Sequence, residues 1–147
     1  MAEPASLRVR ALRMLARREY SRLELQNRLI SAGADVAEVQ CVLDEFEQNG
    51  WLSERRLVDA VVRTRRQRFG AGKVLRELRD KGVSEEGLVQ ARAALSDGEI
   101  ETARNVWNKK FGKRPSSLAE RARQTRFLAG RGFSQEVIRK VLDLADD

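Results

Sequence analysis

The sequence contains no histidine, one cysteine (Cys41) and two prolines, Pro4 and Pro115. The absence of histidine removes the side chain that proteins most often use as a general base and as a metal ligand. A single cysteine without histidine excludes zinc fingers, Cys–His nucleophilic pairs and an internal disulfide. We therefore expect a protein that is not an enzyme and that has no catalytic residue, cofactor or metal site.

Long apolar runs are also lacking. No stretch approaches the ~20 apolar residues that a bilayer-spanning helix needs. The first fifteen residues include Glu3, Arg8, Arg10 and Arg13 and do not resemble a signal peptide. One unpaired cysteine is consistent with a reducing compartment. We predict a cytoplasmic protein without a membrane partner, and we expect it to be a monomer.

Aromatic residues amount to only 5% of the chain, whereas charged residues amount to 35%. This balance favours helices with wide solvated faces over a thick β-sandwich. The scarcity of proline leaves most of the chain free to be helical. The fold class that we predict is all-α.

A short pattern occurs three times at nearly equal intervals. Glycine can adopt the left-handed conformation that ends a helix, and Asp and Ser are good N-caps for the next helix. The pattern therefore predicts pairs of helices that cross at a steep angle, as in helix-turn-helix units. In each copy a leucine precedes a glycine by four residues and an aspartate or serine follows it by two: Leu29, Gly33 and Asp35; Leu78, Gly82 and Ser84; Leu128, Gly132 and Ser134.

Apolar residues follow each of these turns at helical spacings of three and four. The helices before the turns begin at Ser21 and Ser117, which have capping-box spacing to Glu24 and Glu120, and at Gly70, a poorer cap. A further amphipathic helix opens each copy. The three apolar sets are Val36, Val39, Val42, Leu43 and Phe46; Leu88, Val89, Ala91 and Leu95; and Val137, Ile138, Val141, Leu142 and Ala145.

These features predict nine helices in three tandem three-helix (helix-turn-helix-like) repeats. We place the repeats at residues 6–54, 55–99 and 100–147, after a flexible arm at residues 1–5. Each repeat is too short to bury a large core alone, so we expect neighbouring repeats to pack in series. The shape that follows is an elongated, curved solenoid.

The net charge of +7 is spread unevenly along the chain. Residues 7–54 carry seven basic and eight acidic side chains, residues 55–99 carry eleven and seven, and residues 100–147 carry eleven and six. The basic character of the last two thirds favours an acidic partner surface. The alternative is a basic surface that only keeps the protein soluble.

Twelve basic residues in these two thirds are candidates for contacts with a filament or with DNA. Arginine is well suited to bidentate contacts with carboxylate or phosphate groups. For any single candidate, ordinary helix-surface charge is the competing interpretation. The candidates are Arg63, Arg65, Arg66, Arg68, Lys73, Lys109, Lys110, Lys113, Arg114, Arg123, Arg126 and Arg131.

The segment from Gly70 to Val74, with the sequence GAGKV, resembles the end of a phosphate-binding loop. However, Gln67 stands where that loop requires glycine, and Val74 stands where Ser or Thr must hold magnesium. The segment also joins two predicted helices, whereas a phosphate-binding loop follows a strand. We interpret it as a helix start.

The large aromatic residues beside the basic clusters are expected in the core. Trp51 follows Gly50 at the end of the first repeat, which predicts that Trp51 packs the first repeat onto the second. Cys41 is expected to be partly buried. The aromatic residues are Trp51, Phe69, Trp107, Phe111, Phe127 and Phe133.

One combination of motifs indicates a family. Residues 50–57 (GWLSERRL), together with Arg63, Gly70, Leu75–Leu78, Lys81 and Gly82, resemble the central signature of RecX regulatory proteins. Residues 11–33 and 127–134 resemble their first and last repeats, so the likeness spans about residues 7–145. Leu57 departs from the pattern, since the family more often has an aromatic residue there.

The resemblance to the RecX family implies three tandem three-helix units that lodge in the groove of an active RecA–DNA filament. There the protein would restrain strand exchange, ATP hydrolysis and co-protease activity, and so damp the SOS response to DNA damage. The implied partner is the RecA protein filament. The family brings no short catalytic motif to carry over.

Two other functions stay open at this stage. The first is a helical-repeat protein that binds single- or double-stranded DNA weakly, without sequence preference and in a salt-sensitive way. A base-reading helix is disfavoured, because acidic residues such as Glu38, Glu85 and Glu136 lie at the starts of the helices after the turns and would repel phosphates. The second is a purely structural helical scaffold.

Overall fold

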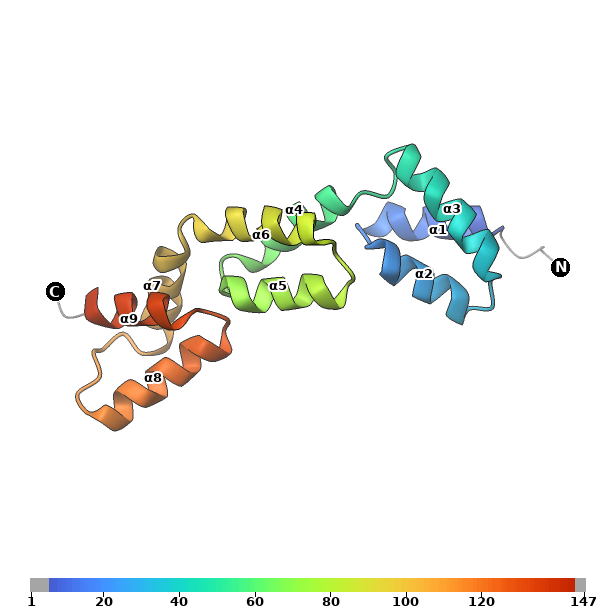
Figure 1. The fold of residues 1–147 in the computed structure, drawn as a ribbon. Coiled ribbons are helices and arrows are strands. Elements are labelled where there is room, and N and C mark those ends of the chain that lie inside the picture. Colours follow the sequence, from blue (N-terminus) through green and yellow to red (C-terminus); the bar gives the residue numbers. More distant parts are fainter. Residues whose placement is uncertain (1–5, 145–147) are drawn as a thin grey trace.

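A computed structural model describes residues 6–144 of the chain. Within these residues the chain forms nine α-helices and no β-strand, as the sequence predicts (Figure 1). The arm predicted at residues 1–5 and the apolar residue Ala145 lie outside the described range. The helices are α1 (Leu7–Arg17), α2 (Arg22–Ser31), α3 (Val36–Gln48), α4 (Glu54–Arg65), α5 (Ala71–Asp80), α6 (Glu85–Ser96), α7 (Glu99–Lys110), α8 (Leu118–Gly130) and α9 (Gln135–Leu144).

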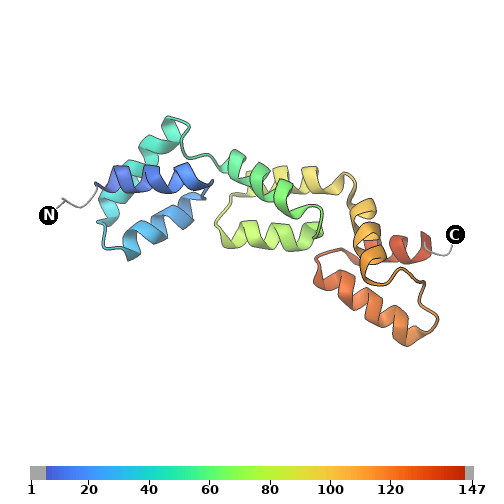
Figure 2. The ribbon, with the colours of Figure 1, turned by 180° about the vertical axis from the view of Figure 1, so that it is seen from behind.

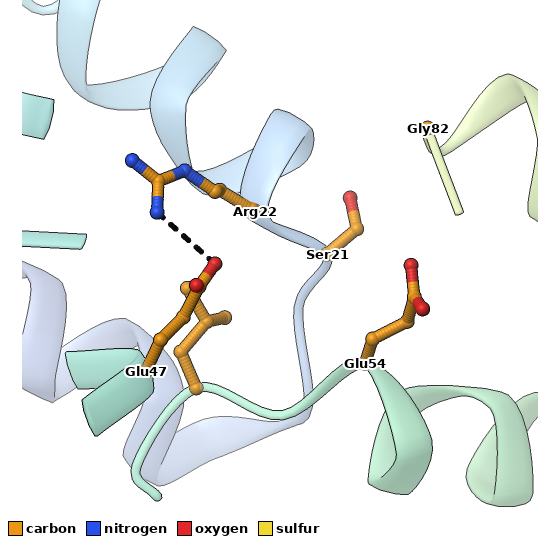
Figure 3. A pocket seen from close by; sticks show the side chains of 6 residues that line it. Ser21, Arg22, Glu47, Glu54 and Gly82 are labelled. Carbon is orange, nitrogen blue, oxygen red and sulfur yellow. Dashed lines mark ion pairs between the residues drawn. The ribbon is translucent and has the colours of Figure 1, made fainter. Parts of the chain in front are cut away.

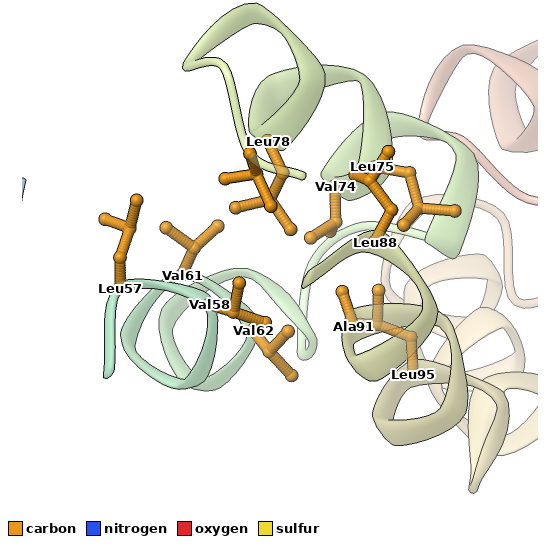
Figure 4. Packing of buried hydrophobic residues seen from close by; sticks show 11 residues of the cluster. Leu57, Val58, Val61, Val62, Val74, Leu75, Leu78, Leu88, Ala91 and Leu95 are labelled. Atoms are coloured by element: carbon orange, nitrogen blue, oxygen red, sulfur yellow. The ribbon is translucent and has the colours of Figure 1, made fainter. Parts of the chain in front are cut away.

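The helices group into three units, each with its own hydrophobic core. Unit 1 comprises α1–α3, unit 2 comprises α4–α6 and unit 3 comprises α7–α9. The core of unit 1 includes the fully buried Leu43 and Phe46, and the core of unit 3 includes Leu128 and Ile138. In unit 2, leucine and valine side chains from all three helices face one another (Figure 4). Each unit therefore buries apolar surface mainly within itself.

The three units lie in a row, with the first and third at opposite ends, which gives the elongated, curved shape (Figure 1 and Figure 2). Helix α4 begins at Glu54 and helix α7 at Glu99, each one residue before the start predicted for its repeat. Helix ends vary by about one or two residues with the definition used. The repeat boundaries themselves remain predictions.

The three predicted turns share one geometry. Gly33, Gly82 and Gly132 have φ angles of 99°, 83° and 96°, a region that residues with a Cβ rarely adopt. The residue after each glycine donates its N–H to the carbonyl of the repeated leucine, at 3.1, 3.0 and 3.2 Å respectively. This hydrogen bond is the mark of a Schellman motif. It ends α2, α5 and α8 where the sequence predicts.

The helices that follow the turns begin at the predicted caps. The side-chain oxygens of Asp35, Ser84 and Ser134 accept the N–H of the residue three positions later, at 3.1, 3.2 and 3.2 Å. These bonds satisfy N–H groups that have no partner inside the helix. The N-cap of helix α5 is Gly70, which has no side chain to form such a bond.

The two predicted capping boxes differ. Ser21 and Glu24 form the complete box, with 3.0 Å bonds between side chain and backbone in both directions. Ser117 accepts the Glu120 N–H at 3.1 Å. However, the Glu120 carboxylate accepts from the N–H and the hydroxyl of Ser116, at 2.7 and 2.8 Å, because Ser116 offers it two donors. The second box is therefore only half formed.

The expected packing of Trp51 between repeats is wrong. Its side chain is 40% exposed, and its ring packs edge to face on Phe46, with the centroids 5.4 Å apart. The reason is the turn at Gly50, with a φ of 76°, after which the Trp51 N–H donates to the Phe46 carbonyl at 2.8 Å. The indole therefore folds back on α3 inside unit 1.

Burial of the other predicted core residues is uneven. Trp107 and Phe133 are buried, whereas Phe69, Phe111 and Phe127 are partly buried against the cores of units 2 and 3. The outer surface carries three residues that were predicted to be at least partly buried. They are Val36 and Val89, which are 54% and 60% exposed, and Cys41.

Helix geometry explains two of these exposures. Successive residues are rotated by about 100° around an α-helix. Val89 directly follows the buried Leu88, and Cys41 lies two positions after the buried Val39. Both side chains therefore point away from the face that their helix buries.

Candidate functional site at the junction of units 2 and 3

Units 1 and 2 meet through charged side chains and through the Leu23 side chain, which lies against Gly82. The Arg56 guanidinium pairs with the Glu19 carboxylate at 3.0 Å, and the Lys81 ammonium pairs with the Glu24 carboxylate at 3.4 Å. Lys81 and Glu24 are about one-fifth exposed, at 22% and 21% of their side-chain surface. This joint therefore combines ion pairs near the surface with one apolar side-chain contact.

The Glu24 carboxylate receives several favourable contacts. Burial raises its pKa, but the hydrogen bond from the Ser21 N–H and the positive charges of Lys81 and Arg18 outweigh burial. The net result is a pKa of Glu24 below its ordinary value. Glu24 thus caps α2 and joins units 1 and 2 as an ionised group.

A hollow beside this joint contains two carboxylates, and both are engaged (Figure 3). Glu47 pairs with Arg22 at 3.1 Å, and Glu54 accepts from the N–H and the hydroxyl of Ser84 at 2.7 and 2.6 Å. Burial lowers the pKa of Arg22, but hydrogen bonds to Asp44 and Glu47 outweigh it and raise that pKa. One carboxylate of the hollow is therefore used in an ion pair of the fold, and the other is used in hydrogen bonds to the start of α6.

Units 2 and 3 meet instead through their backbones. The Gly70 N–H donates to the Arg131 carbonyl at 2.8 Å, and the Gly72 N–H donates to the Gly132 carbonyl at 3.0 Å. The start of α5 thus docks on the turn between α8 and α9. The interpretation of this glycine-rich segment as a helix start is confirmed, and its contact with unit 3 was not predicted.

Aromatic rings and cations from both units gather at this junction. The Arg131 guanidinium lies over the rings of Phe69 and Phe127, 5.5 and 5.2 Å from their centroids. The Lys73 ammonium lies 4.6 Å from the Phe69 centroid, and the Lys110 ammonium lies 5.4 Å from that of Phe127. A cation over an aromatic face is attracted by the ring quadrupole. These contacts hold three of the predicted cations close together.

A hollow at the same junction is lined by cations of both units. Arg68 comes from the segment after α4, and Lys109 and Lys110 come from the last turn of α7, with Phe127 and Arg131 beside them. Among the described residues that line it there is no acid. We call this surface the junction hollow. Its donors and positive charge suit carboxylate or phosphate groups.

The other predicted cations lie elsewhere on the surface. Arg65 pairs with Glu77 at 3.0 Å, and Arg66 donates to the Asp97 carbonyl at 3.2 Å, so both are used in contacts of the fold. The remaining five are exposed and do not line the junction hollow. They are Arg63, Lys113, Arg114, Arg123 and Arg126.

Sequence reasoning missed one residue that orients part of this surface. Gln124 in α8 is only 4% exposed, and its amide Nε2 donates to the Lys113 carbonyl at 3.1 Å. The loop after α7, which carries Lys113 and Arg114, is therefore attached to α8. The available signal was a polar residue four positions before Leu128, on the buried face of a helix, where it needs a hydrogen-bond partner.

Two further properties concern residues 6–144 alone. No group of histidine, cysteine, aspartate or glutamate in this range could hold a metal ion. None of the helices in this range is both long enough and apolar enough to cross a membrane.

Three three-helix units in series define an all-α helical repeat protein. Family models named for RecX match two of the units, the first three-helix domain at residues 8–46 and the third at residues 97–142. The chain belongs to the RecX family.

Relatives named "Regulatory protein RecX" match nearly the whole chain. The relative from Leptothrix cholodnii is 46% identical over 96% of this chain and 90% of its own. The relative from Ralstonia nicotianae is 39% identical over 98% of this chain and 91% of its own. This level of identity over this length shows family membership directly.

Solved structures show the same fold at much lower sequence identity. The crystal structure of RecX from Lactobacillus salivarius aligns with a TM-score of 0.83 at 16% identity and covers 95% of this chain and 94% of its own. A second crystal structure, of regulatory protein RecX, aligns with a TM-score of 0.79 at 19% identity. The row of three units is therefore retained where most side chains differ.

Proposed function

We propose that this protein is a cytoplasmic regulator that binds the RecA nucleoprotein filament. It mainly lowers the recombinase, ATPase and co-protease activities of the filament, and so restrains DNA repair by recombination and the SOS response. It acts by occupying the filament and catalyses no reaction itself. Membership of the RecX family and the name of its relatives support this proposal.

The observation that carries the proposal is the junction hollow. Arg68, Lys109 and Lys110 converge there from two units, and no described lining residue neutralises them. Their field acts mainly at contact range, because the Debye length is about 8 Å at physiological ionic strength. A protein–DNA filament offers both carboxylates and phosphates to such a surface. We assign the filament contact to these three residues first.

The other predicted cations take different places in this proposal. Arg63, Lys113, Arg114, Arg123 and Arg126 are exposed, and we propose them as secondary contacts. The last four belong to neither group, and we propose that they act mainly in contacts of the fold. These are Arg65, Arg66, Lys73 and Arg131.

The proposal is tested by titrating the protein into RecA assembled on single-stranded DNA and measuring ATP turnover. We expect turnover to fall at sub-stoichiometric ratios to RecA. The double variant Arg68→Ala/Lys109→Ala removes two charges from the junction hollow and should require several times more protein for the same effect. The matched control is Arg13→Ala/Arg17→Ala, which removes two charges from exposed positions of α1.

The control should inhibit like the unaltered protein, since its charges lie in unit 1. Unchanged ATP turnover with the unaltered protein at moderate salt contradicts the proposed function. Equal inhibition by both double variants contradicts the assignment to the junction hollow and leaves the filament contact to another face.

Sequence-nonspecific DNA binding is the second candidate function, because the acid-free hollow also suits a phosphodiester. Binding to bare single- or double-stranded DNA should then weaken steeply with salt, since each neutralised phosphate releases counterions. The two functions are separated at a salt concentration where the protein no longer binds bare DNA. Inhibition of RecA that persists there supports the filament regulator, and inhibition that is lost there supports DNA binding.

A further inference from the structure

The joint between units 2 and 3 leaves no room for side chains at its glycines. A Cβ built on Gly70 would lie 2.6 Å from the carbonyl carbon and oxygen of Gly132, and one on Gly72 would lie 2.9 Å from the same oxygen. A Cβ on Gly132 would lie 2.5 Å from the Lys73 nitrogen. Real Cβ atoms do not approach backbone atoms this closely. The two hydrogen bonds of the joint therefore require glycine on both sides.

Conformation does not explain two of these glycines. Gly70 has a φ of −82°, and neither Gly70 nor Gly72 has a positive φ, so other residues could adopt their backbone angles. Only Gly132, with a φ of 96°, also needs glycine for its conformation. Gly70 and Gly72 must therefore be glycine because the backbone of Gly132 lies too close for any side chain.

Side-chain contacts across the same joint surround its two backbone hydrogen bonds. Arg131 of unit 3 lies over Phe69, which packs on the core of unit 2, and over Phe127 of unit 3. Its guanidinium also donates to the Arg68 carbonyl at 3.5 Å. Ala71 donates its N–H to the Glu99 carboxylate at 3.3 Å. The backbone bonds are thus surrounded by further contacts across the junction.

The joint between units 1 and 2 has no equivalent of this backbone pairing among the described hydrogen bonds. Its ion pairs involve side chains that are between one-fifth and one-half exposed, as in Arg56–Glu19 at 47% and 30%. Such pairs contribute little to stability and weaken as salt rises. At this joint the Leu23 side chain also lies against Gly82. One joint is therefore built on paired backbones and the other on side-chain contacts.

We infer that units 2 and 3 form one rigid body, and that Gly70, Gly72 and Gly132 are positioning residues. They hold Arg68 of unit 2 in register with Lys109 and Lys110 of unit 3, so that one fixed cationic surface results. Unit 1 is attached through side-chain contacts, two ion pairs and the packing of Leu23 on Gly82, and this joint bends more easily. The positioning role rests on the proposed function, whereas the rigid body does not.

The rigid body is tested by pulsed electron paramagnetic resonance on doubly spin-labelled full-length protein. The labels are placed at Val89→Cys in unit 2 and Leu118→Cys in unit 3, positions that are 60% and 87% exposed, with Cys41→Ser removing the native thiol. We expect a narrow distance distribution in the parent protein. It should broaden or shift in Gly72→Ala and more so in Gly70→Ala.

Gly130→Ala is the matched control. Gly130 is the last residue of α8, two positions before Gly132, and a Cβ there would have no neighbour within 4 Å. This variant should give the parent distribution. Circular dichroism should show equal helix content in the parent, Gly72→Ala and Gly130→Ala proteins, because a Cβ at Gly72 would meet only the backbone of Gly132 and would leave the unit cores untouched. A Cβ at Gly70 would also meet the buried Phe133 ring at 2.7 Å, so Gly72→Ala is the decisive variant. A narrow, unshifted distribution in both Gly70→Ala and Gly72→Ala, or a broad one in the parent, overturns the inference.

The contrast with unit 1 is tested with labels at the native Cys41 and at Val89→Cys. This distribution should broaden in high salt, while the one between units 2 and 3 stays unchanged. The difference between the two joints is overturned if, in high salt, the distance distribution between units 1 and 2 stays as narrow as the one between units 2 and 3.

The positioning role has a separate readout. In the RecA ATPase titration, Gly72→Ala should need about tenfold more protein or more for half-inhibition, because linked sites lose their avidity when geometry prevents simultaneous contact. Unchanged inhibition together with a broadened distance distribution overturns the positioning role and leaves the rigid body intact. If the parent protein itself leaves RecA unaffected, the proposed function fails and the distance measurements still decide on the rigid body.

Discussion

The indole Nε1 of Trp107 donates a 2.8 Å hydrogen bond to Oε1 of Gln124, and both side chains are buried. Through its Nε2, Gln124 also holds the carbonyl of Lys113. One glutamine therefore joins α7, α8 and the loop between them. Its two bonds satisfy polar groups that would otherwise lose their hydrogen bonds on burial.

Replacing Gln124 should destabilise unit 3. Gln124→Leu keeps much of the side-chain volume but leaves the buried Trp107 N–H without an acceptor, which costs about 1–3 kcal/mol. The measurement is the free energy of unfolding from urea denaturation. The exposed Gln135→Leu is the control and should change stability by less than about 0.5 kcal/mol. Equal stability of the two variants would show that the buried bond is unimportant.

The ionised form of Glu24 should stabilise the joint between units 1 and 2 in a pH-dependent way. Its pKa lies below the ordinary value of 4.5 in the folded protein, so the unfolded chain takes up the proton first as pH falls. The stabilisation is complete above the ordinary pKa and is lost as the pH falls through the lower, folded pKa.

Glu24→Gln isolates this effect, because glutamine can still accept the capping hydrogen bond from Ser21. The unaltered protein should be more stable than the variant at neutral pH, by roughly 0.2–1 kcal/mol for a partly exposed ion pair. The difference in the free energy of unfolding should disappear in acid. A difference that stays constant from neutral to acidic pH rules out this role for the charge.

The separate cores predict local unfolding. Leu43→Ala removes a fully buried side chain from unit 1 and should destabilise that unit by about 2–5 kcal/mol. Hydrogen exchange should then accelerate in α1–α3, while α4–α9 keep their protection. The control Val36→Ala, at a position 54% exposed, should leave exchange nearly unchanged. Equal acceleration in all nine described helices would mean that the units unfold together.

The two tryptophans should respond differently to a soluble quencher. Trp51 is 40% exposed, whereas Trp107 is 6% exposed. Trp51→Phe should therefore leave a fluorescence emission that is shifted to the blue and is only weakly quenched by iodide. Emission from this variant that is quenched as strongly as in the unaltered protein contradicts the burial of Trp107.

The turns, caps and helices could be predicted from the sequence, because each depends on groups close together in the chain. The bond from Ala34 to the Leu29 carbonyl, for example, spans five residues and needs only a glycine at position 33. The bond from Glu38 to Asp35 is equally local. The threefold recurrence of such signals was enough to indicate the number of units, whereas the family was indicated by the resemblance of residues 50–57 and the motifs around them to the RecX signature.

The candidate site was predictable only in part. The charge of Arg68, Lys109 and Lys110 is visible in the sequence, but their convergence depends on contacts between segments far apart in the chain. Trp51 illustrates the same limit, since its position after Gly50 does not reveal which unit the indole will cover. Gln124 could be recognised as a polar residue on a buried face, though not by its partners.

How the units join was decided only by the tertiary structure. Gly70 and Gly72 look like an ordinary helix start, and Gly132 looks like one of three similar turns. Their pairing depends on backbones that approach until no Cβ fits between them. Periodicity and capping report what a residue does within its own helix, whereas a close approach between two backbones depends on the positions of both whole units.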